Sequence, residues 1–173
     1  MHLIAQHTKL APLRLPVIQE NNALLHHHFS WCKKPYTMSD NVSYLERVMK
    51  EHEQKLGFHF ALIHANHYVG EIAIDAFYEE HTIGNVCYWI AQKHQGKGYA
   101  KTALLHLTQW AKKHTQLAYL QIRMEEENTA SRAVAQSAGA VYVKTILDFN
   151  TSTGRIATVY EYHLIIGQKS EMI

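Results

Sequence analysis

The amino-acid sequence predicts an α/β (α+β) domain, with a mixed central sheet of about six to seven strands and flanking helices. Two observations carry this prediction. Hydrophobic residues make up 47% of the 173 residues and charged residues 18%, a balance typical of a globular protein. The apolar pattern also alternates between the two-residue period of strands and the 3.6-residue period of helices. Because no linker or repeat interrupts it, we expect a single domain over residues 1–173, with its core at about 10–165.

The first half of the chain is expected to contain one strand, two helices and a β-hairpin. In the longer helix, Ser43 and Glu46 have the spacing of a capping box. The hairpin turns at 64–67, between two runs rich in β-forming residues. The expected elements are a strand at 10–18, helices at 21–31 and 39–55, and strands at 58–63 and 68–77.

The second half predicts a β-α-β unit. A strand at 85–91 is followed by an amphipathic helix from residue 98 and a strand at 117–124. A crossover helix implies that these two strands are parallel, with a right-handed connection. A helix at 128–138 and strands at 140–149 and 156–165, joined by a turn at 150–154, close the domain.

Composition excludes several functional classes. The formal charge is only +2 and no run of like charges occurs, so we expect no nucleic-acid partner. No stretch approaches the ~18 apolar residues of a membrane span. Two cysteines, with no signal peptide at the N-terminus, favour the cytoplasm. The 14 histidines form no HExxH and no Cys/His zinc spacing, so no metal site is expected.

The segment Gln95-Gly96-Lys97-Gly98-Tyr99-Ala100 carries the chemistry. It lies between a predicted buried strand and the amphipathic helix. Glycines let a ligand approach the backbone closely, and the first turn of a helix offers unpaired N–H groups and partial positive charge. This combination predicts a pyrophosphate site. The Walker loop is absent, and Lys101 stands where a dinucleotide fingerprint requires its last glycine.

Two motifs resemble those of the GNAT acetyltransferases. Gln95-x-x-Gly98-x-Ala100 resembles the Q/R-x-x-G-x-G/A signature, whose backbone amides hold the coenzyme A pyrophosphate. The run 128–131 (Asn-Thr-Ala-Ser) followed by Gly139 is similar to the N-x-x-S…G-F segment of the ribosomal-protein (serine/alanine) N-acetyltransferase branch. Ala140 replaces the phenylalanine of that branch. The resemblance spans roughly 10–165 and agrees with the predicted order of elements.

The resemblance implies a GNAT-type fold in which the strands at 85–91 and 117–124 splay apart. The pantetheine arm of acetyl-CoA fits into the gap like an added strand. Cys87 lies beside that arm and is expected to be a small buried residue rather than a nucleophile. The residues implied to bind the cosubstrate are Tyr88, Trp89, Ile90, Gln95, Gly96, Lys97, Gly98, Tyr99, Ala100 and Asn128.

The family also implies direct attack of an amine on the thioester within a ternary complex. Many members use a tyrosine to protonate the coenzyme A thiolate, but its position here is Ala135, so Ser131 is the expected donor. A backbone N–H on strand 85–91 is expected to stabilise the oxyanion. For the general base we expect Asp148 or Glu71, since Asn150 stands where the branch places an acidic residue.

Three functions remain open at this point. The first is acetylation of a protein N-terminal α-amine, as on ribosomal proteins. The second keeps the chemistry but uses a small amine, such as a polyamine, an amino acid or an aminoglycoside. The third is a coenzyme A-binding module without turnover, because a fold does not guarantee activity. The sequence also leaves open whether the chain forms a homodimer.

Overall fold

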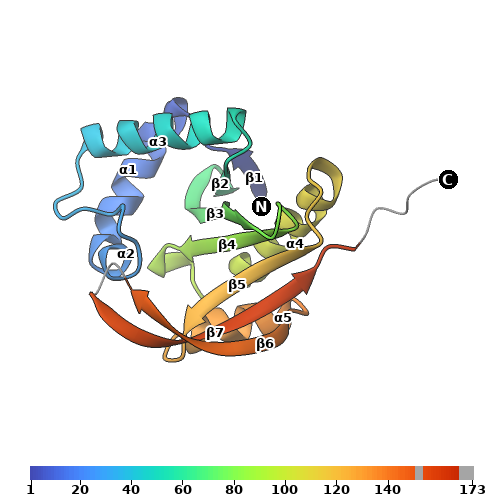
Figure 1. Ribbon diagram of the computed structural model, residues 1–173. Helices are drawn as coiled ribbons and strands as arrows, with labels where there is room; N and C mark the ends of the chain where they lie inside the picture. Colours follow the sequence, from blue (N-terminus) through green and yellow to red (C-terminus); the bar gives the residue numbers. More distant parts are fainter. Residues whose placement is uncertain (151–153, 168–173) are drawn as a thin grey trace.

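The computed structural model of the protein describes residues 1–150 and 154–167 (Figure 1). Within these ranges seven strands form one sheet in the order β1-β2-β3-β4-β5-β7-β6. All neighbouring strands are antiparallel except β4 and β5, which are parallel. The strands are β1 (His2–Ala5), β2 (Phe58–His64), β3 (His67–Tyr78), β4 (Ile83–Ile90), β5 (Tyr119–Glu125), β6 (Val141–Asn150) and β7 (Arg155–Ile165). This architecture confirms the predicted fold class.

Helices cover both faces of the sheet (Figure 1). On one face, α1 and α2 bury apolar residues against Trp89 of β4, whereas α4 and α5 pack over the other face. None of the helices in the described part of the chain is long and apolar enough to cross a membrane. The helices are α1 (Ala11–Glu20), α2 (Asn22–His28), α3 (Met38–Glu53), α4 (Tyr99–His114) and α5 (Thr129–Ser137), with 3-10 turns η1 (Thr8–Leu10) and η2 (Gln92–His94).

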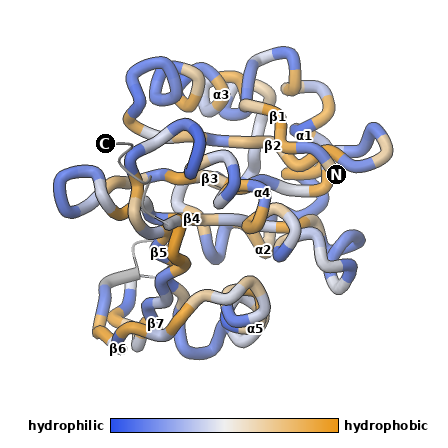
Figure 2. Tube along the Cα trace, turned by 90° about the vertical axis from the view of Figure 1, so that its right-hand side faces the viewer, coloured by the Kyte–Doolittle hydropathy of each residue, from blue (hydrophilic) through white to orange (hydrophobic). Residues whose placement is uncertain are grey.

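The parallel pair divides the molecule. Strand pairing between β4 and β5 runs from Ile83 with Tyr119 to Val86 with Ile122, and ends there. Beyond this point the two strands separate, as Figure 1 shows. Figure 2 shows β5, β6, β7 and α5 on one side of the division and α1, α3 and β1 on the other. The predicted splay between these strands is therefore present, and the sheet has an opening at its centre.

The strand predicted at 10–18 is wrong, because these residues form η1 and α1 instead. The buried residues of this segment include Arg14, Val17 and Ile18, which have helical spacing. Pro12 lies in the first turn, where a missing N–H is harmless. The apolar and polar residues alternate along 10–18 as in a strand, but Arg14, a charged residue of this pattern, is fully buried.

Two further details differ from the prediction. The capping box of α3 is formed by Thr37 and Asp40 rather than by Ser43 and Glu46, because the helix begins at Met38 and Ser43 lies inside it. The short edge strand β1 pairs with β2 and was not predicted. Of the turn predicted at 150–154, residues 151–153 lie outside the described residues.

Candidate active site

A cleft of about 1480 Å³ follows the opening between β4 and β5. One half is lined by the loop before α4 and by the first turn of α5. The other half is lined by α2, α3 and the exposed face of the central strands. A ligand lying in the opening would therefore reach both faces of the sheet.

The glycine loop forms one end of the cleft. Gly96 and Gly98 adopt left-handed conformations with φ of 72° and 76°, and a Cβ added to either would meet no atom within 4 Å. In the described chain, no backbone carbonyl accepts the N–H groups of residues 96–101, and the first bond of α4 runs from Thr102 N to the carbonyl of Gly98. The loop thus presents free amides around open space, as an anion site requires.

Neighbouring side chains complete this end of the cleft. Gln95 donates to the carbonyl of Ile90 at 3.0 Å, so it anchors the loop to β4. The ring of Tyr99 lies 5.0 Å from that of His64, between centroids. Partial burial and the cations Lys97 and Lys93 lower the pKa of His94. Lys93 is paired with Glu20, whereas the charge of Lys97 beside the loop favours a phosphate-bearing ligand.

Ser131 and Tyr88 meet at the wall of the opening. The Tyr88 hydroxyl lies 2.9 Å from Ser131 Oγ and 3.2 Å from the Ser131 carbonyl. Asn128 caps α5 by accepting the N–H of Ser131 at 3.0 Å, which fixes the serine in the first turn. Burial raises the pKa of Tyr88, and the hydrogen bond with Ser131 offsets part of this rise. At neutral pH the phenol is protonated and can donate a proton.

The two remaining cosubstrate candidates on β4, Trp89 and Ile90, have buried side chains. On one edge their backbone pairs with β3, where Glu71 is opposite Trp89 and Gly70 is opposite Ile90. The pairing of β5 with the other edge ends at Val86. The Ile90 carbonyl already accepts from Gln95, so the rest of this backbone edge is what β4 offers to a ligand in the opening.

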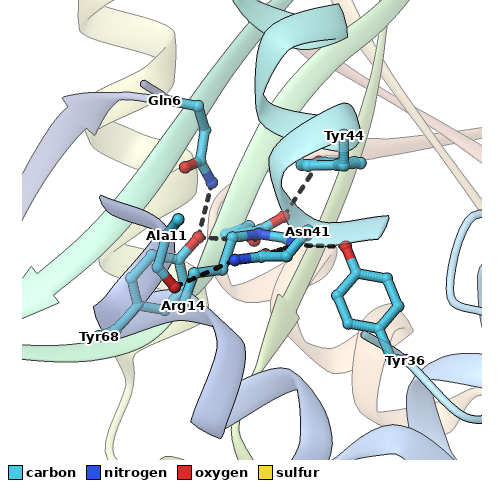
Figure 3. A network of polar contacts seen from close by, with 8 residues as sticks. Gln6, Ala11, Arg14, Tyr36, Asn41, Tyr44 and Tyr68 are labelled. Atoms are coloured by element: carbon cyan, nitrogen blue, oxygen red, sulfur yellow. Dashed lines mark hydrogen bonds and ion pairs between the residues drawn. The ribbon is translucent and has the colours of Figure 1, made fainter. Parts of the chain in front are cut away.

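Glu71 lies in a buried polar network rather than free in the cleft. Its carboxylate accepts hydrogen bonds from Arg14 Nε at 2.5 Å, Tyr68 at 2.6 Å and Tyr44 at 3.1 Å. Arg14 also donates to Tyr36 and to Asn41 (Figure 3). Although burial acts to raise it, the Arg14 charge and these hydrogen bonds lower the pKa of Glu71. This carboxylate joins α1, α3 and β3, and its oxygens are already occupied.

Asp148 lines the cleft from β6. Its carboxylate is 2.8 Å from Arg123 Nη2 on β5, just beyond the last residue that pairs with β4. The side chain of Asp148 is 47% exposed. Both carboxylates predicted from the sequence, Glu71 and Asp148, line the cleft, and each is paired with an arginine.

Sequence reasoning missed three features of the site. The contact between Tyr88 and Ser131 joins β4 to α5 and has no local signature. Arg123 and Asp75 are charged residues inside predicted strands, and this unusual position could have marked them as site residues. An aromatic wall formed by Phe29 and Trp31, with ring centroids 5.6 Å apart, also lines the half of the cleft next to α2 and α3. Among the described residues, no three His, Cys, Asp or Glu side chains are grouped to hold a metal ion.

A mixed sheet that opens between two parallel strands, with a helix N-terminus at the opening, defines a class of proteins that bind an extended, phosphate-bearing ligand across the sheet. Residues 8–141 match the family described as Acetyltransferase (GNAT) domain. Because this match covers most of the chain, the protein belongs to the GNAT acetyltransferase family.

Solved structures share the fold. The microcin C7 self-immunity acetyltransferase MccE, in complex with acetyl-CoA and AMP, has a TM-score of 0.87 at 18% identity and covers 94% of this chain and 91% of its own. RimL, the ribosomal L7/L12 alpha-N-protein acetyltransferase in complex with coenzyme A, has a TM-score of 0.87 at 18% identity and coverages of 94% and 92%. The ribosomal-protein-S5-alanine acetyltransferase from Vibrio fischeri has a TM-score of 0.82 at 18% identity and coverages of 94% and 91%. No curated protein sequence matches significantly.

Proposed function

We propose that the protein is an acetyl-CoA-dependent N-acetyltransferase that moves the acetyl group directly to a primary amine in a ternary complex. The observation that carries this proposal is the continuity of the opening between β4 and β5 with the amide-lined loop at 96–101. In this proposal the loop holds the pyrophosphate of acetyl-CoA, and the free edge of β4 pairs with the pantetheine arm.

The departing thiolate needs a proton, and the Ser131–Tyr88 pair supports that role. Ser131 is the residue suggested by the family motif, and the phenol 2.9 Å away supplies a second exchangeable proton. We propose that the serine hydroxyl donates to the coenzyme A sulfur and is reprotonated through Tyr88. Asn128 then acts as a positioning residue, because it caps the turn that carries Ser131.

As acceptor we propose a protein N-terminal α-amine of the ribosomal-protein type. The serine and asparagine of the 128–131 motif support this acceptor, and ribosomal-protein enzymes are among the proteins with this fold. An α-amine has a pKa near ~8 and is already partly neutral at physiological pH. A small-molecule amine is the second candidate, supported by the similarity to MccE, whose structure contains AMP.

We further propose that residues 1–173 work as one domain in the cytoplasm. A single sheet that extends from His2 to Ile165 supports the undivided domain. Cys32 and Cys87, both free thiols, are compatible with a reducing compartment.

The test is release of free thiol from acetyl-CoA by the purified chain, over a panel of N-terminal peptides and small amines. We expect thiol release that depends on the acceptor, with peptides beginning in serine or alanine used best. Preference for a polyamine, an amino acid or an aminoglycoside would support the second candidate. Tight binding of acetyl-CoA without transfer to any member of the panel would contradict an enzymatic function.

A further inference from the structure

We propose that Asp75 is the carboxylate that receives the acceptor amine and takes its proton, an assignment that rests on the function proposed above. Asp75 lines the cleft from β3 and is exposed there. The register of β3 with β4 shifts between Ile74, which pairs with Val86, and Ala76, which pairs with Asn85. Asp75 is therefore the extra residue of a β-bulge, a device that re-aims a side chain.

The side chain of Asn85 on β4 holds this carboxylate in place. Asn85 Nδ2 donates to Asp75 Oδ1 at 2.8 Å, and the thiol of Cys87 lies close enough to feel the charge of the same carboxylate. Behind Asn85, Gln121 of β5 donates to Asn85 Oδ1 at 3.5 Å. Burial, with the charge of Asp75, raises the pKa of the Cys87 thiol, so this neighbour of Asp75 stays neutral. These contacts orient Asp75 without neutralising it.

Charge pairing distinguishes Asp75 from the other acids of the cleft. Among the described residues no cation forms an ion pair with Asp75. The other carboxylates that line the cleft are each within ion-pair distance of an arginine: Glu51 with Arg47, Glu71 with Arg14, Glu125 and Glu127 with Arg155, and Asp148 with Arg123. An exposed carboxylate without a cation, fixed inside a cleft, fits a positively charged or hydrogen-bond-donating ligand such as an amine.

The face of the sheet from which Asp75 reaches the opening also fits the proposed reaction. Side chains alternate along β4, so Asn85 and Cys87 lie on one face and Tyr88 on the other. Trp89, on the first face, packs in the cluster under α1 and α2, and Tyr88 packs against the cluster under α4 and α5. Asp75 therefore approaches the opening from the face opposite to the Ser131–Tyr88 pair. An amine held by Asp75 would therefore reach the thioester carbon through the opening from one face of the sheet, while the sulfur bonded to that carbon faces Ser131 on the other.

These groups account for every proton in the proposed reaction. The neutral amine forms a bond to the thioester carbonyl carbon, and the carbon–sulfur bond breaks with its electron pair on sulfur. The proton released by the nitrogen passes to the Asp75 carboxylate and then to water. The sulfur takes a proton from the Ser131–Tyr88 pair, which regains one from water. Asp75 thus acts as general base for the acceptor, a role that Glu71 and Asp148 would perform only after leaving their arginines.

The experiment compares wild type, Asp75→Asn and Asp75→Glu in the thiol-release assay, with Glu80→Gln as control. Glu80→Gln removes the same charge from the exposed turn after β3, outside the cleft. For Asp75→Asn we expect kcat/KM for the amine to fall roughly 10²-fold, the usual size of a general-base effect, with unchanged KM and Kd for acetyl-CoA. Asp75→Glu, which keeps the carboxylate, should be more active than Asp75→Asn, and Glu80→Gln should match wild type.

The outcomes separate the two proposals. If wild type transfers acetyl and Asp75→Asn stays within about twofold of it, the assignment of Asp75 is overturned while the proposed function stands. An equal loss of affinity for acetyl-CoA in Asp75→Asn would indicate a structural role and would also overturn it. No transfer by wild type to any amine would contradict the proposed function, and the assignment of Asp75 with it.

Discussion

The hydroxyl groups of Ser131 and Tyr88 share one hydrogen bond at the wall of the cleft, with 2.9 Å between their oxygens. Neither hydroxyl group loses its proton readily by itself, and burial raises the pKa of the phenol. In the proposed mechanism they keep a proton next to the leaving sulfur. The asparagine cap of α5 preserves this geometry.

Removing either hydroxyl should slow the chemical step. For Ser131→Ala we expect kcat to fall roughly 10²-fold, because the sulfur loses its donor, and for Tyr88→Phe a smaller fall, because water can replace the phenol. Binding of acetyl-CoA, measured by calorimetry, should be unchanged in both. If both variants keep the kcat of wild type, the pair is not the proton source.

The Arg14–Glu71 pair is a structural element at the residue scale. Both side chains are buried, and the guanidinium lies 4.0 Å from the centre of the Tyr44 ring. Removing the charge of Glu71 would leave a cation in the core without its partner.

We therefore expect Glu71→Gln to lower the free energy of unfolding by about 3–5 kcal/mol. The matched control is Glu20→Gln, which breaks the surface pair with Lys93, whose side chains are 54% and 53% exposed, and should cost at most about 1 kcal/mol. Denaturant titration of the two variants measures the difference. Equal losses would show that the buried pair adds no stability of its own.

At the scale of elements, the loop before α4 is built for close approach of a ligand. Gly98 has a φ of 76°, and the space above it is open. An alanine there would suffer the left-handed backbone cost of roughly 1–2 kcal/mol and would place a methyl group in the proposed anion site.

We expect Gly98→Ala to raise the Kd for acetyl-CoA at least about tenfold, a loss of about 1.4 kcal/mol. Gly154→Ala is the matched control, because Gly154 has a φ of 69° and equally open space but lies in the turn before β7. It should bear the same backbone cost with unchanged affinity. Isothermal calorimetry with both variants decides, and equal affinities would place the pyrophosphate elsewhere.

Elements whose signals are local were predicted well. The hairpin of β2 and β3, the β-α-β unit and the glycine loop follow from period and turn residues within short windows. The segment at α1 was misread because the burial of Arg14 depends on Glu71, a partner 57 residues away. The Asp75 bulge and the Tyr88–Ser131 contact likewise arise from strand register and helix packing, which a single sequence does not display.

For the whole molecule, the buried His59 and the half-buried His52 link stability to pH. Burial lowers the pKa of His59 and of His52 below the usual value of about 6.5. Between the lowered folded value and 6.5, the unfolded chain binds protons that the folded chain does not, so stability falls as the pH falls.

We expect the free energy of unfolding to decrease from pH 7.5 to pH 5.5, and His59→Gln to make this dependence shallower. Denaturant midpoints at a series of pH values provide the measurement. A stability that is constant or increases toward pH 5.5 would contradict the assignment of buried, neutral histidines.

The central claim is that acetyl-CoA lies in the opening between β4 and β5 with its diphosphate at the glycine loop. A crystal structure of the complex with acetyl-CoA tests it most directly. We predict the diphosphate oxygens within hydrogen-bond distance, roughly 3 Å, of the amides of residues 96–101, and the thioester sulfur beside the hydrogen-bonded pair of Ser131 and Tyr88. A diphosphate bound away from this loop, or amides occupied by protein groups, would contradict it.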